Sequence, residues 1–247
     1  MTSNQDRRIA VVTEAGRRGG IGFEVCRQLA VRGVHVVLTA RDPEAVAARQ
    51  QDLRALGHDV SAEWLDVAAP SRVAAFAETI ADRFGHVDVL VNNAAGVNAF
   101  GEAPSTADLG KAHESLEVTL FGAWRLTQML LPSLLRGAHP RIVNVSSGAG
   151  SHGDPTFGLT TRNAMGPSYA VAKAALNALT VTFANELRDR RVLVNAVCPG
   201  FTATFPGGEQ MGARPVPEGA AGIVWAALLP DDGPTGGFFR DGKALPW

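Results

Sequence analysis

The sequence predicts an α/β fold of the Rossmann type, a doubly wound sheet, mostly or wholly parallel, with about seven strands and helices on both faces. Three observations predict it. Short β-branched runs alternate with longer amphipathic stretches along most of the chain. A glycine-rich turn follows the first of these runs, and irregular stretches rich in glycine and proline follow two later ones. In open α/β sheets, ligands bind beyond such strand ends.

The expected strands are short apolar runs, each long enough for one buried strand. They are Ile9–Thr13, Val34–Thr39, Val60–Val67, Val87–Val91, Arg141–Val145 and Val192–Val197. The expected helices fill the intervals with apolar residues at helical spacing, at Ile21–Arg32, Pro43–Leu56, Ser71–Phe84, Leu116–Leu135 and Ser168–Leu187. Strand–helix alternation at this spacing implies right-handed crossovers and a sheet covered on both faces.

The composition indicates one globular domain over residues 1–247. The chain is 46% hydrophobic and 19% charged, and no linker, repeat or low-complexity segment divides it. A net charge of −1 gives no overall attraction to nucleic acid or to acidic membranes. The six histidines show no metal-ligand spacing, so no metal site is expected.

The chain is expected to be soluble and cytoplasmic. Its two cysteines, Cys26 and Cys198, form no disulfide framework or zinc pattern. The segment Met1–Arg8 lacks the apolar core of a signal peptide. No apolar run approaches the roughly 18 residues that a membrane span needs.

A glycine-rich turn between the first strand and the first helix indicates a phosphate-binding loop. Glycines allow a tight turn and close approach of the backbone to a pyrophosphate, and the helix that follows offers free N–H groups. The loop contains the candidate cofactor residues Gly16, Arg17, Arg18, Gly20, Ile21 and Gly22.

The end of the second strand predicts a preference for NADPH. An acidic residue here usually binds the ribose 2′-hydroxyl of NAD, whereas Arg41 suits a 2′-phosphate. Arg17 or Arg18 could supply a second cation. Asp42 precedes Pro43, which is the pattern of a helix N-cap followed by proline in the first turn.

Tyr169 is the only tyrosine in the chain and lies four residues before Lys173. A helix places both side chains on one face. A nearby ammonium group favours the phenolate, so we expect the pKa of Tyr169 to be lowered from its ordinary value. Such a tyrosine can donate a proton to a carbonyl oxygen while hydride reaches the carbon, and Ser147 can hold that oxygen.

The ordered set of motifs resembles the short-chain dehydrogenase/reductase family along nearly the whole chain. The set comprises the glycine-rich turn, Leu65-Asp66-Val67, Asn92-Asn93-Ala94-Ala95-Gly96, Asn144-Val145-Ser146-Ser147, Tyr169-Ala170-Val171-Ala172-Lys173 and Cys198-Pro199-Gly200. Leu38–Asp42 and Gly236–Gly242 look like its carbonyl-reductase-like branch. The resemblance implies that Tyr169 is the acid, Ser147 the carbonyl orienter, and Lys173 both a tuner of the tyrosine pKa and a ribose ligand.

The same resemblance assigns further cofactor contacts. Asp66 and Val67 would face the adenine, and Asn92 with Ala94 would lie beside the ribose. Pro199, Gly200, Thr202 and Thr204 would hold the nicotinamide carboxamide.

Three departures from the family pattern are visible. The family motif Thr-Gly-x-x-x-Gly-Ile-Gly becomes a loop two residues longer, in which Glu14 and Ala15 separate Thr13 from Gly16. Glu14 would oppose phosphate binding if it points inward. Gly96 comes one place late after Ala95, and Thr119 stands where the family's helix asparagine is expected.

These features predict an NADPH-dependent reductase for a ketone, aldehyde or quinone-like carbonyl. The segments Gly148–Pro167 and Phe201–Pro217 would wall the substrate site, or would be ordinary surface connections. Phe157, Leu159 and Met165 favour a hydrophobic substrate, whereas His152 and Asp154 are expected to be exposed. Two other interpretations remain: a cofactor-binding relative with little turnover that acts as a sensor or structural partner, and an alcohol dehydrogenase working oxidatively.

The long helices Leu116–Leu135 and Ser168–Leu187 suggest a homodimer or homotetramer. Small residues on the second helix would allow close helix packing between subunits or onto the protein's own sheet. They are Ala170, Ala174, Ala175 and Ala178.

Overall fold

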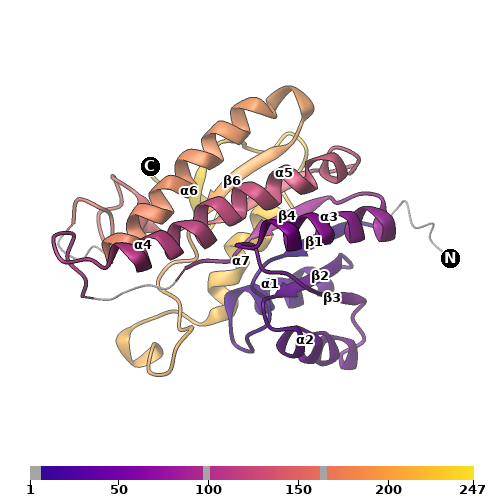
Figure 1. Cartoon of the computed structure of the whole chain (residues 1–247), viewed down its shortest axis with the longest axis horizontal. Helices are drawn as coiled ribbons and strands as arrows, with labels where there is room; N and C mark the ends of the chain where they lie inside the picture. Colours follow the sequence, from indigo (N-terminus) through magenta and orange to yellow (C-terminus); the bar gives the residue numbers. More distant parts are fainter. Residues whose placement is uncertain (1–6, 97–100, 162–165) are drawn as a thin grey trace.

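A computed structural model describes residues 7–96, 101–161 and 166–247. It contains one eight-stranded sheet with the order β3-β2-β1-β4-β5-β6-β7-β8. Neighbouring strands from β3 to β7 are parallel, and only β8 pairs antiparallel, with β7. The prediction of a doubly wound, mostly parallel Rossmann-type sheet is confirmed (Figure 1).

The predicted strands and helices lie close to their observed positions. The strands are β1 (Ile9–Val12), β2 (His35–Ala40), β3 (Val60–Trp64), β4 (Val89–Asn92), β5 (Arg141–Val145), β6 (Leu193–Val197), β7 (Phe238–Arg240) and β8 (Lys243–Ala244). The helices are α1 (Ile21–Val31), α2 (Pro43–Ala55), α3 (Pro70–Phe84), α4 (Leu109–Leu116), α5 (Ala123–Leu134), α6 (Pro167–Glu186) and α7 (Val216–Ala227).

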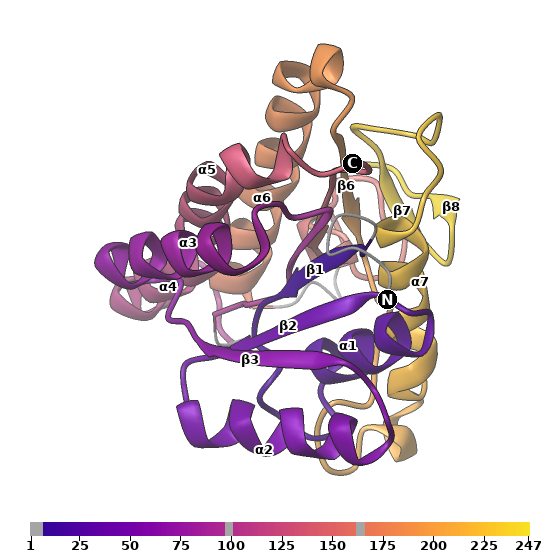
Figure 2. The ribbon, with the colours of Figure 1, turned by 90° about the vertical axis from the view of Figure 1, so that its right-hand side faces the viewer.

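Two apolar cores cover the two faces of the sheet. Figure 2 shows α1 and α2 on one side of β1–β3 and α3 with α5 on the other. Consecutive residues of β1 divide between the cores, because strand side chains alternate between faces: Ile9 and Val11 pack with α3, α5 and α6, and Ala10 and Val12 pack with α1, α2 and α7. Both faces are apolar, as expected for a parallel sheet.

The single helix expected at Leu116–Leu135 is wrong in its start and in its continuity. The helical path begins earlier, at Leu109, where Asp108 accepts hydrogen bonds from the N–H groups of Gly110 and Lys111. A π-helical segment, Glu117–Gly122, then joins α4 to α5. A π-helical turn widens the helix by one residue, and it often lies beside a functional site.

The small residues of α6 face different surroundings. Ala170 is buried within the chain's own fold, whereas Ala178 is exposed. Packing onto the protein's own sheet therefore accounts for only some of the four small residues of this helix.

Among the described residues, no helix is long and apolar enough to span a membrane. The same residues contain no group of three or more His, Cys, Asp or Glu side chains placed to hold a metal ion. Cys26 and Cys198 are both free and buried.

Candidate active site

Ser147 lies two residues after the end of β5 and caps a short 3-10 turn, Gly148–Gly150. Its hydroxyl oxygen accepts a hydrogen bond of 3.2 Å from the N–H of Ala149. The turn packs tightly on α6: a Cβ at Gly150 would lie 2.5 Å from the backbone carbon of Lys173. Glycine at this position therefore lets the segment that carries Ser147 approach the backbone of α6.

Helix α6 supplies Tyr169 and Lys173 from its first two turns. The Lys173 ammonium lies 5.6 Å from the centre of the Tyr169 ring and donates a 2.6 Å hydrogen bond to the carbonyl of Val145, at the end of β5. The lysine is 2% exposed. The predicted one-face arrangement of this pair is present, and it lies against the strand that leads to Ser147.

The pKa values of this pair differ from the sequence expectation. Burial raises the pKa of Tyr169 to about 12, and a hydrogen bond with Ser147 opposes part of that rise. Burial lowers the pKa of Lys173 to about 8. The expectation that the ammonium lowers the pKa of Tyr169 is therefore wrong for this structure, because desolvation of the phenolate dominates. A phenol with a raised pKa stays protonated at neutral pH and can act as a proton donor.

Asn177, one turn beyond Lys173 on α6, joins the helix to the Ser147 segment. Its side-chain oxygen accepts a 2.5 Å hydrogen bond from the hydroxyl of Ser146, and its amide donates a 3.1 Å bond to the carbonyl of Gly150. Asn177 is 5% exposed. Both segments flanking Ser147 are thus bonded to the helix that carries Tyr169. Sequence reasoning missed this residue, although its spacing of four from Lys173 was visible.

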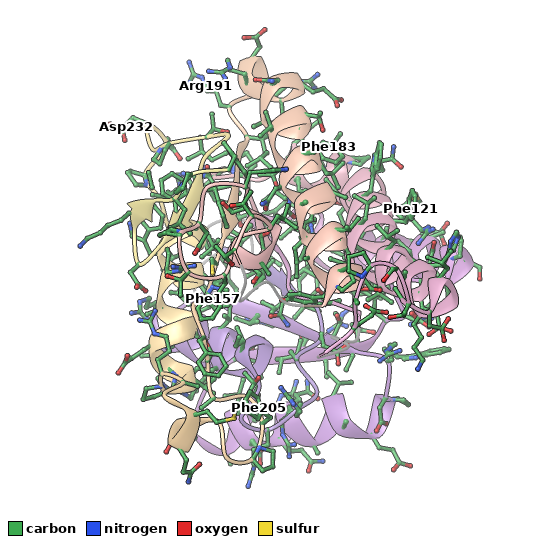
Figure 3. The ribbon with its side chains drawn as sticks, turned by 90° about the vertical axis from the view of Figure 1, so that its left-hand side faces the viewer. Phe121, Phe157, Phe183, Arg191, Phe205 and Asp232 are labelled. Carbon is green, nitrogen blue, oxygen red and sulfur yellow. The ribbon has the colours of Figure 1, made fainter. Side chains whose placement is uncertain are left out.

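Ser147 and Tyr169 open into a cavity of about 280 Å³. Phe157, Phe201 and Phe205 form its apolar wall, with ring centres 6.3 Å apart for Phe157 and Phe201 and 6.2 Å apart for Phe201 and Phe205. Figure 3 shows Phe157 and Phe205 on two separate loops. Both predicted irregular stretches therefore contribute a wall. Leu159 is not among the lining residues, and Met165 lies outside the described residues.

The four residues Pro199, Gly200, Thr202 and Thr204 also line this cavity. Thr204 and Ile21 belong in addition to a neighbouring cavity of about 460 Å³, which extends along the glycine-rich loop. Glu14 and Arg17 are shared between that cavity and a third one, of about 290 Å³, which reaches Arg41. A continuous groove therefore runs along the carboxyl ends of the strands, from Tyr169 to Arg41.

The glycine-rich loop allows close backbone contacts along this groove. A Cβ at Gly16 would lie 2.8 Å from the Cβ of Ala40, and a Cβ at Gly22 would lie 2.5 Å from the carbonyl oxygen of Glu14. Gly20 lines the groove directly before α1 begins at Ile21. The loop thus ends beside the groove at the N-terminus of a helix, where a phosphate could be bound.

Glu14 takes up a left-handed backbone conformation, with φ of 55°. It directly follows Thr13, where the family motif has glycine. Ala15 is buried and donates a 2.8 Å hydrogen bond to the carbonyl of Thr39, so the added residues pack against β2. The side chain of Glu14 is exposed and lines the groove.

The three arginines proposed for a phosphate lie in different surroundings. Arg17 and Arg41 line the same cavity, about 290 Å³ in volume. Arg18 instead pairs with Asp52 on α2, at 2.6 Å. Asp42 caps α2 by accepting hydrogen bonds from the N–H groups of Glu44 and Ala45, which confirms its structural role.

At the end of β4, the groove is lined by Asn93, Ala95 and Gly96. The predicted Asn92 and Ala94 are buried, at 3% and 9% exposure. Asn92 donates to Asn144 and Thr127 and so belongs to a polar network in the core.

The proposed adenine residues lie close to the same groove. Asp66 accepts a hydrogen bond from the N–H of Ala68, which itself lines a cavity of about 720 Å³ together with Arg41 and Gly96. Val67 is buried and packs on Gly122.

Thr119 and the late Gly96 form one structural unit. The N–H of Gly96 donates a 3.0 Å hydrogen bond to the Thr119 hydroxyl. A Cβ at Gly96 would lie 2.4 Å from the Cα of Ser115. The two departures from the family pattern are thus linked, because the displaced glycine packs on α4 and is bonded to the residue that replaces the asparagine.

Asp154 is buried, which corrects the expectation that it is exposed, whereas His152 is exposed as expected. The Asp154 carboxylate pairs with Arg240 at 2.6 Å and accepts hydrogen bonds from the N–H groups of Thr156 and Phe157. Arg240 lines the cavity beside Tyr169 and was missed, because its partner lies 86 residues away in sequence.

Comparisons with known proteins agree with this geometry. A family model described as short chain dehydrogenase matches residues 8–211. The chain is 33% identical to a (+)-neomenthol dehydrogenase of Arabidopsis thaliana, in an alignment that covers 94% of this chain and 95% of the relative. Among solved structures, an NADPH-bound carbonyl reductase from chicken fatty liver has a TM-score of 0.83 and 27% identity, covering 98% of this chain and 99% of that one. A metagenomic short-chain oxidoreductase in complex with NADP has a TM-score of 0.76 and 31% identity, with coverages of 94% and 96%.

Proposed function

Because the chain belongs to the short-chain dehydrogenase family, we propose that it is an NADPH-dependent reductase of a ketone, aldehyde or quinone-like carbonyl. One observation carries the proposal. Ser147 and Tyr169 line one end of a continuous groove, with the buried Lys173 next to Tyr169, and Arg17 and Arg41 lie at its other end. Reductase names among the relatives, and solved structures that hold NADP or NADPH, support it.

The residues of the groove fit a nicotinamide dinucleotide phosphate. Glycines at positions 16 and 22 let the loop pack closely on β2 and on Glu14, and a pyrophosphate would lie beside this loop, next to the N-terminus of α1. Arg17 and Arg41 can bind a 2′-phosphate, because a guanidinium group matches phosphate geometry. Pro199, Gly200, Thr202 and Thr204 line the end where the nicotinamide would lie, beside Tyr169.

When bound, the reduced nicotinamide supplies a hydride to the carbonyl carbon of the substrate. The hydroxyl of Ser147 orients the carbonyl oxygen by a hydrogen bond, which strengthens as negative charge develops. Tyr169 donates its phenolic proton to that oxygen, so the product is an alcohol. Lys173, protonated below its pKa of about 8, stabilises the phenolate that remains.

The binding of NADPH and NADH to the purified protein tests the cofactor assignment. Intrinsic fluorescence from the four tryptophans would report each titration. We expect Arg41→Ala and Arg17→Ala each to weaken NADPH binding about tenfold or more, since a hydrogen bond to a charged group contributes about 1.5–3 kcal/mol, and to leave NADH binding nearly unchanged.

Arg18→Ala is the matched control, because Arg18 pairs with Asp52 and does not line the groove. Equal weakening by all three substitutions would contradict the assignment of Arg17 and Arg41. If neither NADPH nor NADH binds, the reductase function itself is refuted.

A further inference from the structure

Arg240 contributes the one charged side chain among the described residues that line the cavity beside Ser147 and Tyr169. It lies at the end of β7 and is 24% exposed, whereas the side chain of its partner, Asp154, is fully enclosed. The walls around it are the aromatic rings of Phe157, Phe201 and Phe205. A guanidinium group therefore lines a small cavity whose other polar groups are uncharged.

The position of this guanidinium is fixed next to Ser147. Its Nη2 atom donates to Asp154 at 2.6 Å and to the sulfur of Cys198 at 3.3 Å. A Cβ at Gly148 would lie 2.6 Å from Nη2. Gly148 directly follows Ser147, so the charged group lies close to the residue that would hold the reacting carbonyl.

The guanidinium retains donors that the protein does not use. Both contacts of Arg240 in the described part of the chain are made by Nη2. Nε is buried without a partner and is closed to a ligand, so the donor left for one is Nη1, which has no hydrogen bond to the described residues. A guanidinium N–H that faces an apolar cavity is best satisfied by an oxygen acceptor of the ligand.

We propose that Arg240 selects carbonyl substrates that carry a second oxygen close to the reacting carbonyl, as in a β-keto ester or a 1,3-diketone. The reacting carbonyl lies against Ser147 and Tyr169, the second oxygen accepts from Arg240, and the apolar body contacts the phenylalanine wall. This inference rests on the reductase function proposed above and adds the substrate class to it.

A matched pair of ketones tests the inference. Ethyl benzoylacetate and hexanophenone share a phenyl ketone and chain length, but only the first carries further oxygens. For the wild type we expect kcat/KM to favour the keto ester. Arg240→Lys keeps a positive charge opposite Asp154 and loses the planar fork of donors. We expect it to lower kcat/KM for the keto ester at least about tenfold, mainly through KM, and to change that for hexanophenone by less than about threefold.

The change in the ratio between the two ketones is the decisive quantity, because it cancels their different intrinsic reactivity. Arg83→Lys, on α3 and paired with Glu63, is the matched control and should leave the ratio unchanged. Should Arg240→Lys fail to fold, the double substitution Asp154→Asn with Arg240→Gln neutralises both partners. An equal loss for both ketones would show a purely structural role and would overturn the inference.

Binding of the keto ester by isothermal titration calorimetry separates this inference from the reductase function. If neither ketone is reduced with NADPH present, the reductase function fails, and calorimetry alone decides the role of Arg240. Weaker binding of the keto ester to Arg240→Lys than to the wild type would then support the inference. Equal binding of the keto ester to the wild type and to Arg240→Lys, or no binding to the wild type, would overturn the inference.

Discussion

At the reaction end of the groove, Lys173 and Asn177 are almost completely enclosed, and each is bonded to backbone atoms beside Ser147. At the phosphate end, Glu14 and Arg17 are exposed, and the loop is two residues longer than the family motif. Proton transfer requires placement within hydrogen-bond reach, whereas a phosphate can be held by backbone N–H groups and mobile cations. In this chain the lengthened loop therefore lies at the end where binding would be electrostatic, and the enclosed, hydrogen-bonded residues lie at the end where geometry would govern the rate.

The largest expected effect lies at the reaction end. Tyr169→Phe removes the proton donor and should lower kcat about 10²–10⁴-fold, with NADPH affinity changed by less than about threefold. Steady-state kinetics and the fluorescence titration measure both quantities. Because Tyr169 is the only tyrosine, the variant also removes the tyrosinate absorbance near about 295 nm and provides its baseline. A variant with nearly full activity would show that the two ends do not differ in this way.

Lys173→Met should separate stability from function. Burial lowers the pKa of Lys173 from 10.5 to about 8, so below about pH 8 the folded protein bears the cost of a buried ammonium. That cost disappears as pH rises from about 8 to 10.5, where the unfolded chain also loses the proton. The lowered pKa corresponds to a cost of about 3 kcal/mol in the free energy of unfolding. Lys173→Met removes this cost, but it also removes the hydrogen bond to Val145, and that loss offsets about 1 kcal/mol of the gain.

The Lys173→Met variant should therefore be more stable than the wild type by about 2 kcal/mol at pH 7, with the difference shrinking toward pH 10. Chemical denaturation at both pH values measures it. Its turnover should be lost. A variant that is less stable at pH 7 would show that the ammonium stabilises the fold and that the reaction end carries no such cost.

The fold was largely predictable, whereas contacts between distant segments were not. Runs such as Val192–Val197 predicted strands because both faces of a parallel sheet are apolar. Leu109–Leu116 was missed because Ser115 is the one buried residue of this helix, so no apolar face marks it in the sequence. Ser147, Tyr169 and Lys173 were proposed from motif spacing, and the structure brings them together, whereas Arg41 was proposed from its place after a strand. Arg240 and Asp154 were not paired, because 86 residues separate them and only the fold brings them together.

Asn177→Leu tests how the reaction end is positioned. The substitution removes both hydrogen bonds that join α6 to Ser146 and Gly150. We expect kcat to fall about tenfold with a small change in KM, because misplacement affects the reaction more than binding. The pKa of Tyr169 should rise further, since its hydrogen bond with Ser147 opposes the effect of burial. Absorbance titration of the single tyrosine measures this without any substrate.

Asn185→Leu is the control for that experiment, because Asn185 lies on α6 but is exposed, and its side chain accepts a hydrogen bond from the nearby Arg188. Asn177→Asp, which keeps an acceptor for Ser146, should recover part of the rate. If Asn177→Leu lowers stability but leaves the tyrosine titration and kcat unchanged, Asn177 is a packing residue and not a positioning one.

The smallest effect is expected at the phosphate end. Glu14 adopts φ of 55°, which costs a residue other than glycine about 1–2 kcal/mol. Glu14→Gly relieves that strain but increases the freedom of the unfolded chain, so stability should change by less than about 1 kcal/mol. Removal of a negative charge from the groove should tighten NADPH binding about threefold at low salt, and less at high salt.

Glu14→Gln distinguishes the two causes, because it removes the charge and keeps the strained backbone. Equal tightening in both variants would assign the effect to charge, whereas tightening in Glu14→Gly alone would assign it to the loop conformation. A loss of NADPH affinity in Glu14→Gly would mean that the left-handed glutamate shapes the phosphate site. The phosphate end would then be as closely restricted as the reaction end, and the contrast between them would fail.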